Sequence, residues 1–201
     1  FKKGKPFLDK IEYVNLPDGN VRMVNLQQGE VDIVGQGWFP GEFYSKIKDD
    51  PAITVETDVS MQHDWLVLNT TRAPFNNKKI RQAFSLAINR EDIVNIYGGL
   101  ATAAYRIFSP ALTEYHVDKT LPTYKFDPEK AKELIEESGI AKEDINFSIM
   151  TAEFLPTFPS IAEILQSNLR DIGLNPSIDV RDPGAAINAL AVDKDFDAFL
   201  I

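Results

Sequence analysis

The side chains that could act as an acid, a base or a nucleophile are few in this sequence. It holds two histidines, His63 and His116, and no cysteine. A Ser-His-Asp arrangement could use either histidine, but neither a Gly-x-Ser-x-Gly turn nor another nucleophile signature accompanies them. Because a catalytic site needs convergent groups, we expect His63 to be a polar residue at a strand end. We expect the chain not to be an enzyme.

Patterns that could bind a metal ion are incomplete. Neither histidine has a further ligand at metal-binding spacing, and the lack of cysteine excludes thiolate zinc sites and disulfides. Asp193, Asp195 and Asp197 alternate like the first ligands of a calcium loop. The Gly at the sixth position and the Glu at the twelfth are missing, so a solvated face is expected. We therefore predict no metal and no cofactor.

A glycine-rich stretch follows the apolar run 31–34, with Gly35, Gly37 and Gly41. A dinucleotide-binding loop needs its third glycine three positions after the second. That position is Pro40, so the spacing argues against a nucleotide site. The glycines still permit a tight exit from a strand, and Trp38 and Phe39 would lie on the loop that follows it.

The periodicity of apolar residues predicts the elements that must position these groups. Strands are predicted at 11–16, 31–34, 53–59, 62–69, 145–149, 178–180 and from 196 onward. Helices are predicted at 20–28, 40–49, 80–97 with a break near Asn89, 128–139, 161–172 and 182–192. Residues 11–34 read as a β-α-β unit, the strand 62–69 as a central one, and residues 100–124 as a long ordered excursion. The order predicts a single α/β domain with a mixed, mostly parallel sheet.

Composition limits the class of partner. The chain has 201 residues, is 44% hydrophobic and carries a formal net charge of -9. It can bury a core, but its acidic surface would repel nucleic acid and anionic lipid. No apolar run is long enough to insert into a membrane. The chain begins at Phe1 without a Met and ends within an apparent strand, so we expect it to be a piece of a longer protein.

Several motifs occur together and in one order along the chain. They are Gly29-Glu30-Val31-Asp32, Asn69, Pro74-Phe75-Asn76, Arg81-Gln82-Ala83, Ala87-Ile88-Asn89-Arg90, Gly99, Ser109-Pro110, Tyr124 with Asp127-Pro128, and Ile172-Gly173-Leu174. In this the sequence resembles family 5 of the extracellular solute-binding proteins, which includes oligopeptide-, dipeptide- and nickel-binding components of ABC importers. Most of the motif residues have caps, turns or packing as their structural explanation.

The resemblance implies one lobe of a two-lobed, class II periplasmic-binding-protein-like fold. Residues 1–201 would form a single α/β lobe, with the N-terminal lobe and a closing segment outside the sequence. The implied function is capture of oligopeptides or dipeptides between the lobes and delivery to permease subunits. The implied location is the periplasm or the outer face of the cell membrane, with a lipid anchor in some members. We expect a monomer.

Candidate ligand contacts are aromatic and amide groups at strand ends and on the excursion, since ligands of α/β sheets bind beyond the strands' carboxyl ends. They are Trp38, Phe39, Asn69, Tyr105, Phe108 and Phe154. Packing is the alternative role for each. Alternative functions are a receptor for nickel chelates, sugars or another solute, an α/β hydrolase or transferase, and a ligand-sensing regulatory domain.

Overall fold

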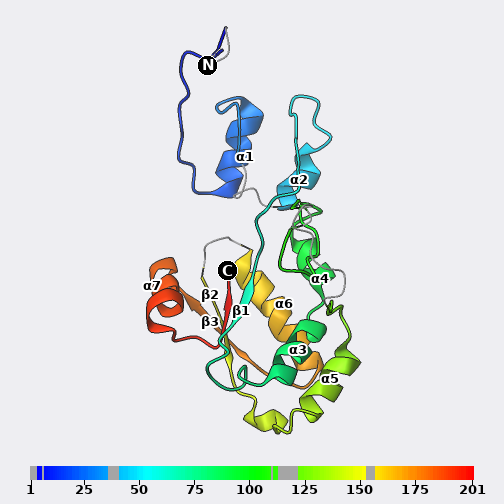
Figure 1. Ribbon diagram of the computed structural model, residues 1–201. Helices are drawn as coiled ribbons and strands as arrows, with labels where there is room; N and C mark the ends of the chain where they lie inside the picture. The colour runs from blue at the N-terminus through cyan, green and yellow to red at the C-terminus, as the bar shows by residue number, and fades with distance from the viewer. Residues whose placement is uncertain (1–3, 6, 36–40, 110, 113–121, 153–156) are drawn as a thin grey trace. The chain divides into compact units, whose positions relative to one another are not determined.

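Figure 1 shows the computed structural model, which describes residues 4–5, 7–35, 41–109, 111–112, 122–152 and 157–201. The chain divides into two compact units, Phe1–Val55 and Glu56–Ile201. Each unit has apolar clusters of its own. The interpretation of residues 1–201 as one lobe stays a prediction.

The first unit contains two helices, α1 (Gly19–Gln28) and α2 (Gly41–Ile47). The Asp18 carboxylate accepts a hydrogen bond from the Val21 amide and caps α1, so the helix begins one residue before the predicted start. Gly29 ends the helix as predicted, with a φ of 75° that a side chain would strain. A small cluster around Met23, Phe43 and Ile47 forms the core of this unit.

The strands predicted at 11–16, 31–34 and 53–59 are wrong: the structure has no strand in these ranges. An apolar alternation becomes a strand only where a neighbouring strand accepts its backbone hydrogen bonds. No ladder partner is present among the described residues, and Tyr13 and Ile33 are 93% and 85% exposed. The predicted β-α-β unit at 11–34 is therefore wrong as well.

The second unit is built on a four-stranded sheet with the order β1–β4–β2–β3. The strands are β1 (Leu66–Leu68), β2 (Ser148–Ala152), β3 (Ser177–Arg181) and β4 (Ala198–Leu200). β2 is parallel to both β3 and β4, whereas β1 pairs antiparallel with β4. The predicted mixed, mostly parallel α/β sheet is confirmed. The central position predicted for residues 62–69 is wrong, because β1 is short and forms one edge.

Alternate residues of the strands enter two separate apolar clusters. Leu66 and Leu200 join the cluster covered by α3 (Lys78–Ala87), α4 (Arg90–Ile96), α5 (Pro128–Glu136) and α6 (Phe158–Asp171). Val67 and Phe199 face the other cluster, under α7 (Pro183–Asn188) and the π-helical turn η3 (Ala189–Asp193). Helices therefore cover both faces of the sheet (Figure 1). One 3-10 turn, η2 (Lys142–Asp144), precedes β2.

Three phenylalanines form the centre of the larger cluster. The ring centroids of Phe75 and Phe84 lie 4.8 Å apart, those of Phe84 and Phe147 4.9 Å, and those of Phe75 and Phe147 5.3 Å. All three pairs meet edge to face, the geometry that aromatic quadrupoles favour. The trio joins α3 and the segment before it to the residue before β2, so it connects the helical layer to the sheet.

Side-chain caps set the helix boundaries of the second unit. The predicted break near Asn89 is confirmed: α3 ends at Ala87, and Asn89 caps α4 by accepting from the Glu91 amide. Asp127 and Asp182 cap α5 and α7 as predicted, each accepting an amide hydrogen bond. Within the described part of the chain, no helix has the length and apolar content needed to cross a membrane.

Candidate functional site

The strands of the second unit share one edge that we call the carboxyl edge, formed by residues 63–65, Ala152, Arg181 and Ile201. β2, β3 and β4 are parallel and end there, and β1 begins there because it runs the opposite way. The Trp65 amide donates to the Ile201 carbonyl over 2.6 Å, and the Ile201 amide donates back over 2.9 Å. Ligands of α/β sheets bind beyond this kind of edge, so it is the candidate site.

An aromatic pair lies at the start of β1 on this edge. The ring centroids of His63 and Trp65 are 5.1 Å apart at an interplanar angle of 33°. His63 Nδ1 lies 3.2 Å from the Met61 carbonyl oxygen, and Trp65 is 40% exposed. His63 precedes β1, which begins at Leu66, and the pair gives the edge an accessible aromatic surface.

Between these two rings in sequence, Asp64 points to the opposite face of the strand. Its Oδ2 accepts a hydrogen bond from the phenol of Tyr97, the residue after α4. The hydroxyl of Thr157, at the start of α6, lies 3.5 Å from the same phenol oxygen and donates to it. Burial and then the hydrogen bond to Asp64 raise the pKa of Tyr97 above its usual range. Tyr97 is therefore a protonated donor, and Asp64 is the acceptor.

Arg90 holds the excursion that follows α4. Its guanidinium donates to the carbonyls of Ser85 (3.2 Å) and Tyr124 (3.4 Å), and it lies 5.0 Å from the ring centroid of Tyr105. Burial lowers the pKa of Arg90 from its ordinary value, while Tyr105 acts in the opposite direction. One half-buried cation therefore contacts both Tyr105 and Tyr124, which lie near the two ends of the predicted excursion 100–124.

A second contact fixes the middle of the excursion. The Ser109 hydroxyl donates to the Ser60 carbonyl over 2.7 Å and accepts from the Ala111 amide over 3.1 Å. Ser109 is 2% exposed, whereas the neighbouring Phe108 is 42% exposed. The Ser109 hydrogen bond thus joins the excursion to the segment that leads to β1. The exposed ring of Phe108 lies next to Ser109 in the chain.

The structure separates the predicted ligand contacts. Trp38, Phe39 and Phe154 lie outside the described residues. Tyr105 packs on Arg90, and Phe108 is exposed on the same excursion. Asn69 lies at the other end of β1, away from the carboxyl edge. Ligand contact stays a prediction for all of these residues.

Asn69 is held by hydrogen bonds within the chain. Its side-chain amide donates to the carbonyls of Lys194 (3.2 Å) and Phe196 (3.0 Å). Its Oδ1 accepts from the amide and the hydroxyl of Thr71, over 3.1 and 2.7 Å. The side chain is 7% exposed, so these bonds fix the turn that precedes β4.

Sequence reasoning missed Asp64, Trp65 and Tyr97 as residues of the candidate site. The alternation along residues 64–68 could have shown that Asp64 shares a face with Leu66 and Leu68, toward the helices. No pattern in the sequence shows that Tyr97 meets Asp64, because 33 residues separate them.

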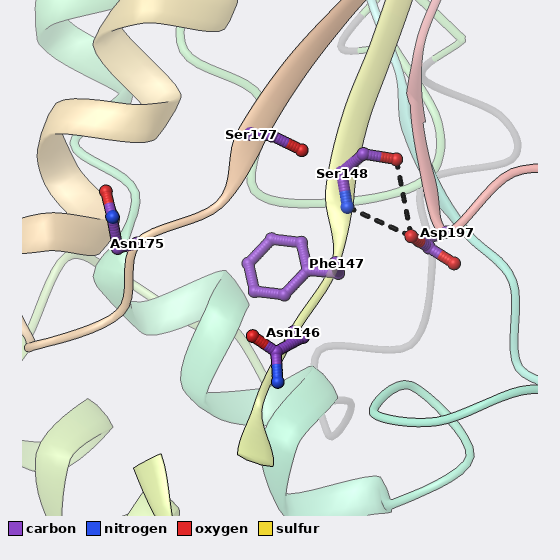
Figure 2. A pocket seen from close by; sticks show the side chains of 6 residues that line it. All are labelled: Asn146, Phe147, Ser148, Asn175, Ser177 and Asp197. Atoms are coloured by element: carbon purple, nitrogen blue, oxygen red, sulfur yellow. Dashed lines mark hydrogen bonds between the residues drawn. The ribbon is translucent and has the colours of Figure 1, made fainter. Parts of the chain in front are cut away.

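The opposite end of the sheet, which we call the amino edge, carries a polar hollow of about 410 Å³. It is lined by Asn146, Phe147, Ser148, Asn175, Ser177 and Asp197 (Figure 2). Asp197 Oδ2 accepts from the amide of Ser148 at 2.9 Å and from its hydroxyl at 3.3 Å. Because the carboxylate is occupied in joining β4 to β2, this hollow has a structural explanation and lies away from the edge where ligands are expected.

The acidic alternation before β4 is partnered by an arginine. Arg72 lies 3.3 Å from an oxygen of Asp195 and 3.5 Å from one of Asp197. These aspartates were predicted to lie on a solvated face. The side chain of Asp195 is 67% exposed, as that prediction requires, whereas that of Asp197 is only 23% exposed. Among the residues that the structure describes, no three His, Cys, Asp or Glu side chains are grouped as a metal site would need.

Comparison with known proteins gives one family. The family model described as bacterial extracellular solute-binding proteins, family 5 Middle, matches residues 1–201. Oligopeptide-binding protein AppA of Bacillus subtilis is 26% identical over 212 residues, covering 99% of this chain and 38% of that protein. The nickel-binding periplasmic protein of Escherichia coli is 29% identical over 188 residues, covering 87% of this chain and 36% of that protein.

A solved structure shows the same fold. The periplasmic binding protein DppA of Helicobacter pylori, in complex with the peptide STSA, has a TM-score of 0.77 and 26% sequence identity. The match covers 92% of this chain and 35% of that one. The chain therefore spans little more than a third of the relatives that it matches.

Proposed function

Because the chain belongs to family 5 of the bacterial extracellular solute-binding proteins, we propose that it is part of the capture component of an ABC importer. Its solute is a small molecule, and the first candidate for this molecule is an oligopeptide or dipeptide. The observation that carries this proposal is the match of the family model to the whole of residues 1–201. The peptide assignment is supported by AppA, named as oligopeptide-binding, and by DppA, solved with a bound peptide.

The carboxyl edge is the part of this chain that contributes to solute binding. Trp65 supplies an accessible aromatic surface there, and Phe108 supplies another on the excursion. Aromatic side chains form apolar pockets that tolerate different side chains of a peptide. Trp38, Phe39, Asn69, Tyr105 and Phe154 remain proposed contacts on the grounds given by the sequence.

The remaining parts of the proposal keep the expectations drawn from the sequence and its resemblance to the family. The protein acts by binding and release and not as an enzyme, and it works outside the cytoplasm with permease subunits of the importer. We propose that residues 1–201 form one lobe of a monomer located in the periplasm or at the outer face of the cell membrane, where a lipid anchor would hold the full protein. In such a protein the solute is captured between two lobes that close over it, and one of these lobes is formed by this chain.

A second candidate solute is a nickel chelate. The observation that favours it is the likeness to the nickel-binding periplasmic protein, which is 29% identical over 188 residues. A single scaffold that serves both kinds of solute must obtain its specificity from side chains at the site and not from the fold.

Native mass spectrometry of the full-length protein, purified from its own host, tests the proposal. A set of bound masses that fragment into short peptides is the expected result. A bound chelate that contains nickel would contradict the peptide assignment and favour the second candidate. Titration of the emptied protein with the identified solute in a calorimeter then gives the affinity.

A further inference from the structure

Asp64 occupies a defined place on the carboxyl edge. It immediately precedes Trp65, whose backbone pairs with Ile201 in both directions, so it lies where β1 begins and β4 ends. The strand alternates, and Leu66 and Leu68 on the same face pack against the cluster under α4 and α6. The Asp64 side chain accordingly points toward the ends of these two helices.

The carboxylate of Asp64 is oriented and exposed. Tyr97, which follows α4, donates to one of its oxygens, and Thr157, which precedes α6, in turn donates to Tyr97. Asp64 itself is exposed to solvent. Among the described residues, no Lys, Arg or His side chain forms an ion pair with it. The same residues offer no donor to its second oxygen, and an ionised carboxylate can only accept hydrogen bonds.

The oriented carboxylate differs from the other acidic groups described at the sheet. Asp195 and Asp197 are paired with Arg72, and Asp179 is paired with Arg181 over 2.7 Å. Those contacts neutralise charge within the chain, whereas the contact with Tyr97 leaves the charge of Asp64 uncompensated. A phenol is a neutral donor, so it fixes the direction of the carboxylate without satisfying its need for a cation.

We propose that Asp64 is a specificity-determining residue whose carboxylate binds a cationic group of the solute, an ammonium or a guanidinium. Tyr97 is its positioning residue. The inference rests on the proposed function, since it names the chemical group that the carboxyl edge selects. A charge-assisted hydrogen bond from a solute cation to a carboxylate held in this way is stronger than one between neutral groups.

Four synthetic peptides separate the two sources of positive charge. They are Ala-Lys-Ala, the same peptide with norleucine in place of lysine, and the N-acetylated form of each. Calorimetry on the full natural chain measures the affinity of the unsubstituted protein and of Asp64→Asn for all four. The carboxamide introduced by Asp64→Asn can still accept from Tyr97, so the substitution removes charge and keeps the local hydrogen bond.

The expected result is a loss of about tenfold or more in affinity for the peptides that carry the recognised cation, with the affinity for the acetylated norleucine peptide, which carries no cation, unchanged. If the α-ammonium is the group, acetylation weakens binding to the unsubstituted protein and has little effect on Asp64→Asn. If the lysine side chain is the group, replacement by norleucine does so instead. The control Glu163→Gln, an equal change of charge at an exposed position of α6, should leave all four affinities unchanged.

Tyr97→Phe distinguishes a binding role from a purely structural one. It keeps the charge of Asp64 but removes the donor that orients it, so we expect a smaller loss that is again confined to the cationic peptides. Equal losses for all four peptides in both variants would overturn the inference and leave a structural tie between β1 and α4. Unchanged affinities in Asp64→Asn would overturn it too. Failure of the unsubstituted protein to bind any of the peptides would instead overturn the peptide assignment, and the inference with it.

Discussion

The side-chain amide of Asn69 donates a hydrogen bond to the carbonyl oxygen of Phe196 over 3.0 Å, joining positions 127 residues apart. The same amide reaches the carbonyl of Lys194, whose φ of 54° lies in the left-handed region. A non-glycine residue in this conformation needs support from its surroundings. The side chain after β1 therefore holds the turn from which β4 starts.

Replacement of Asn69 by alanine should destabilise the fold by about 2–4 kcal/mol, because the buried carbonyl of Phe196 and the part-buried carbonyl of Lys194 would lose their donor. Chemical denaturation followed by far-ultraviolet circular dichroism measures the change. Thr70→Ala is the matched control, at an exposed position of the same loop, and it should cost about 0.5 kcal/mol or less. Equal effects of the two substitutions would contradict the role given to Asn69.

Phe84→Ala removes the ring that contacts both Phe75 and Phe147 in the centre of the larger cluster. Phe84 is 1% exposed, so we expect a loss of about 3–5 kcal/mol in unfolding free energy. Phe126→Ala serves as control, since Phe126 is 45% exposed. Thermal and denaturant unfolding should show a loss of less than about 1 kcal/mol for the control.

Arg90→Lys keeps the positive charge but loses the planar fork that reaches Ser85 and Tyr124. We expect a destabilisation of about 1–3 kcal/mol and faster proteolysis within residues 100–124, because the excursion loses its common anchor. Arg170→Lys, at an exposed position, is the control and should change neither quantity. An unchanged proteolysis pattern in Arg90→Lys would show that other contacts hold the excursion.

The raised pKa of Tyr97 predicts a stability effect at alkaline pH. Below the ordinary tyrosine pKa of roughly 10, the phenol is protonated in both the folded and the unfolded chain. At higher pH the unfolded chain loses this proton while the folded chain retains it, so the contribution of Tyr97 to stability falls as the pH rises. The difference in unfolding free energy between the unsubstituted protein and Tyr97→Phe should therefore narrow from about pH 9 to about pH 11. A constant difference would contradict the raised pKa.

Solute binding should alter the fluorescence of the two tryptophans, Trp38 and Trp65. Trp65 is 40% exposed on the carboxyl edge, so covering it by solute should shift its emission to shorter wavelength. Trp65→Phe should remove most of this shift, and any remainder reports contact at Trp38. If Trp65→Phe preserves the full shift and Trp38→Phe abolishes it, the solute lies at the predicted loop and not at β1.

The helices of the second unit could be predicted from the sequence because caps and helix-ending residues lie next to the apolar stripe of the helix that they bound. Asp127 and Asn89 lie next to the apolar stripes that they cap, and Gly173 follows the last turn of α6. The strands at 11–16 and 31–34 were wrong because strand formation depends on a partner, which a local alternation does not specify. β1 was placed at the centre for the same reason: its apolar density reflects burial under two clusters and not a position between two strands.

The candidate site was harder to predict than the fold. Asp64 and Tyr97 come together only because β1 begins at the edge where α4 ends, which requires the antiparallel pairing of β1 with β4. Asn69 was singled out for its place at a strand end. Sequence alone could not show which end of the sheet this was, since that depends on the direction of β1 relative to its neighbour.

The amino and carboxyl edges are separated by β4, a strand of three residues. The bonds of Asn69 and Asp197 lie at one end of it, and the groups proposed to choose the solute lie at the other. Substitutions that change the proposed solute specificity can therefore accumulate in evolution without breaking the hydrogen bonds that hold the sheet together. In a library randomised at positions 63–65, most variants should fold. In a library randomised at positions 69–72, few variants should fold.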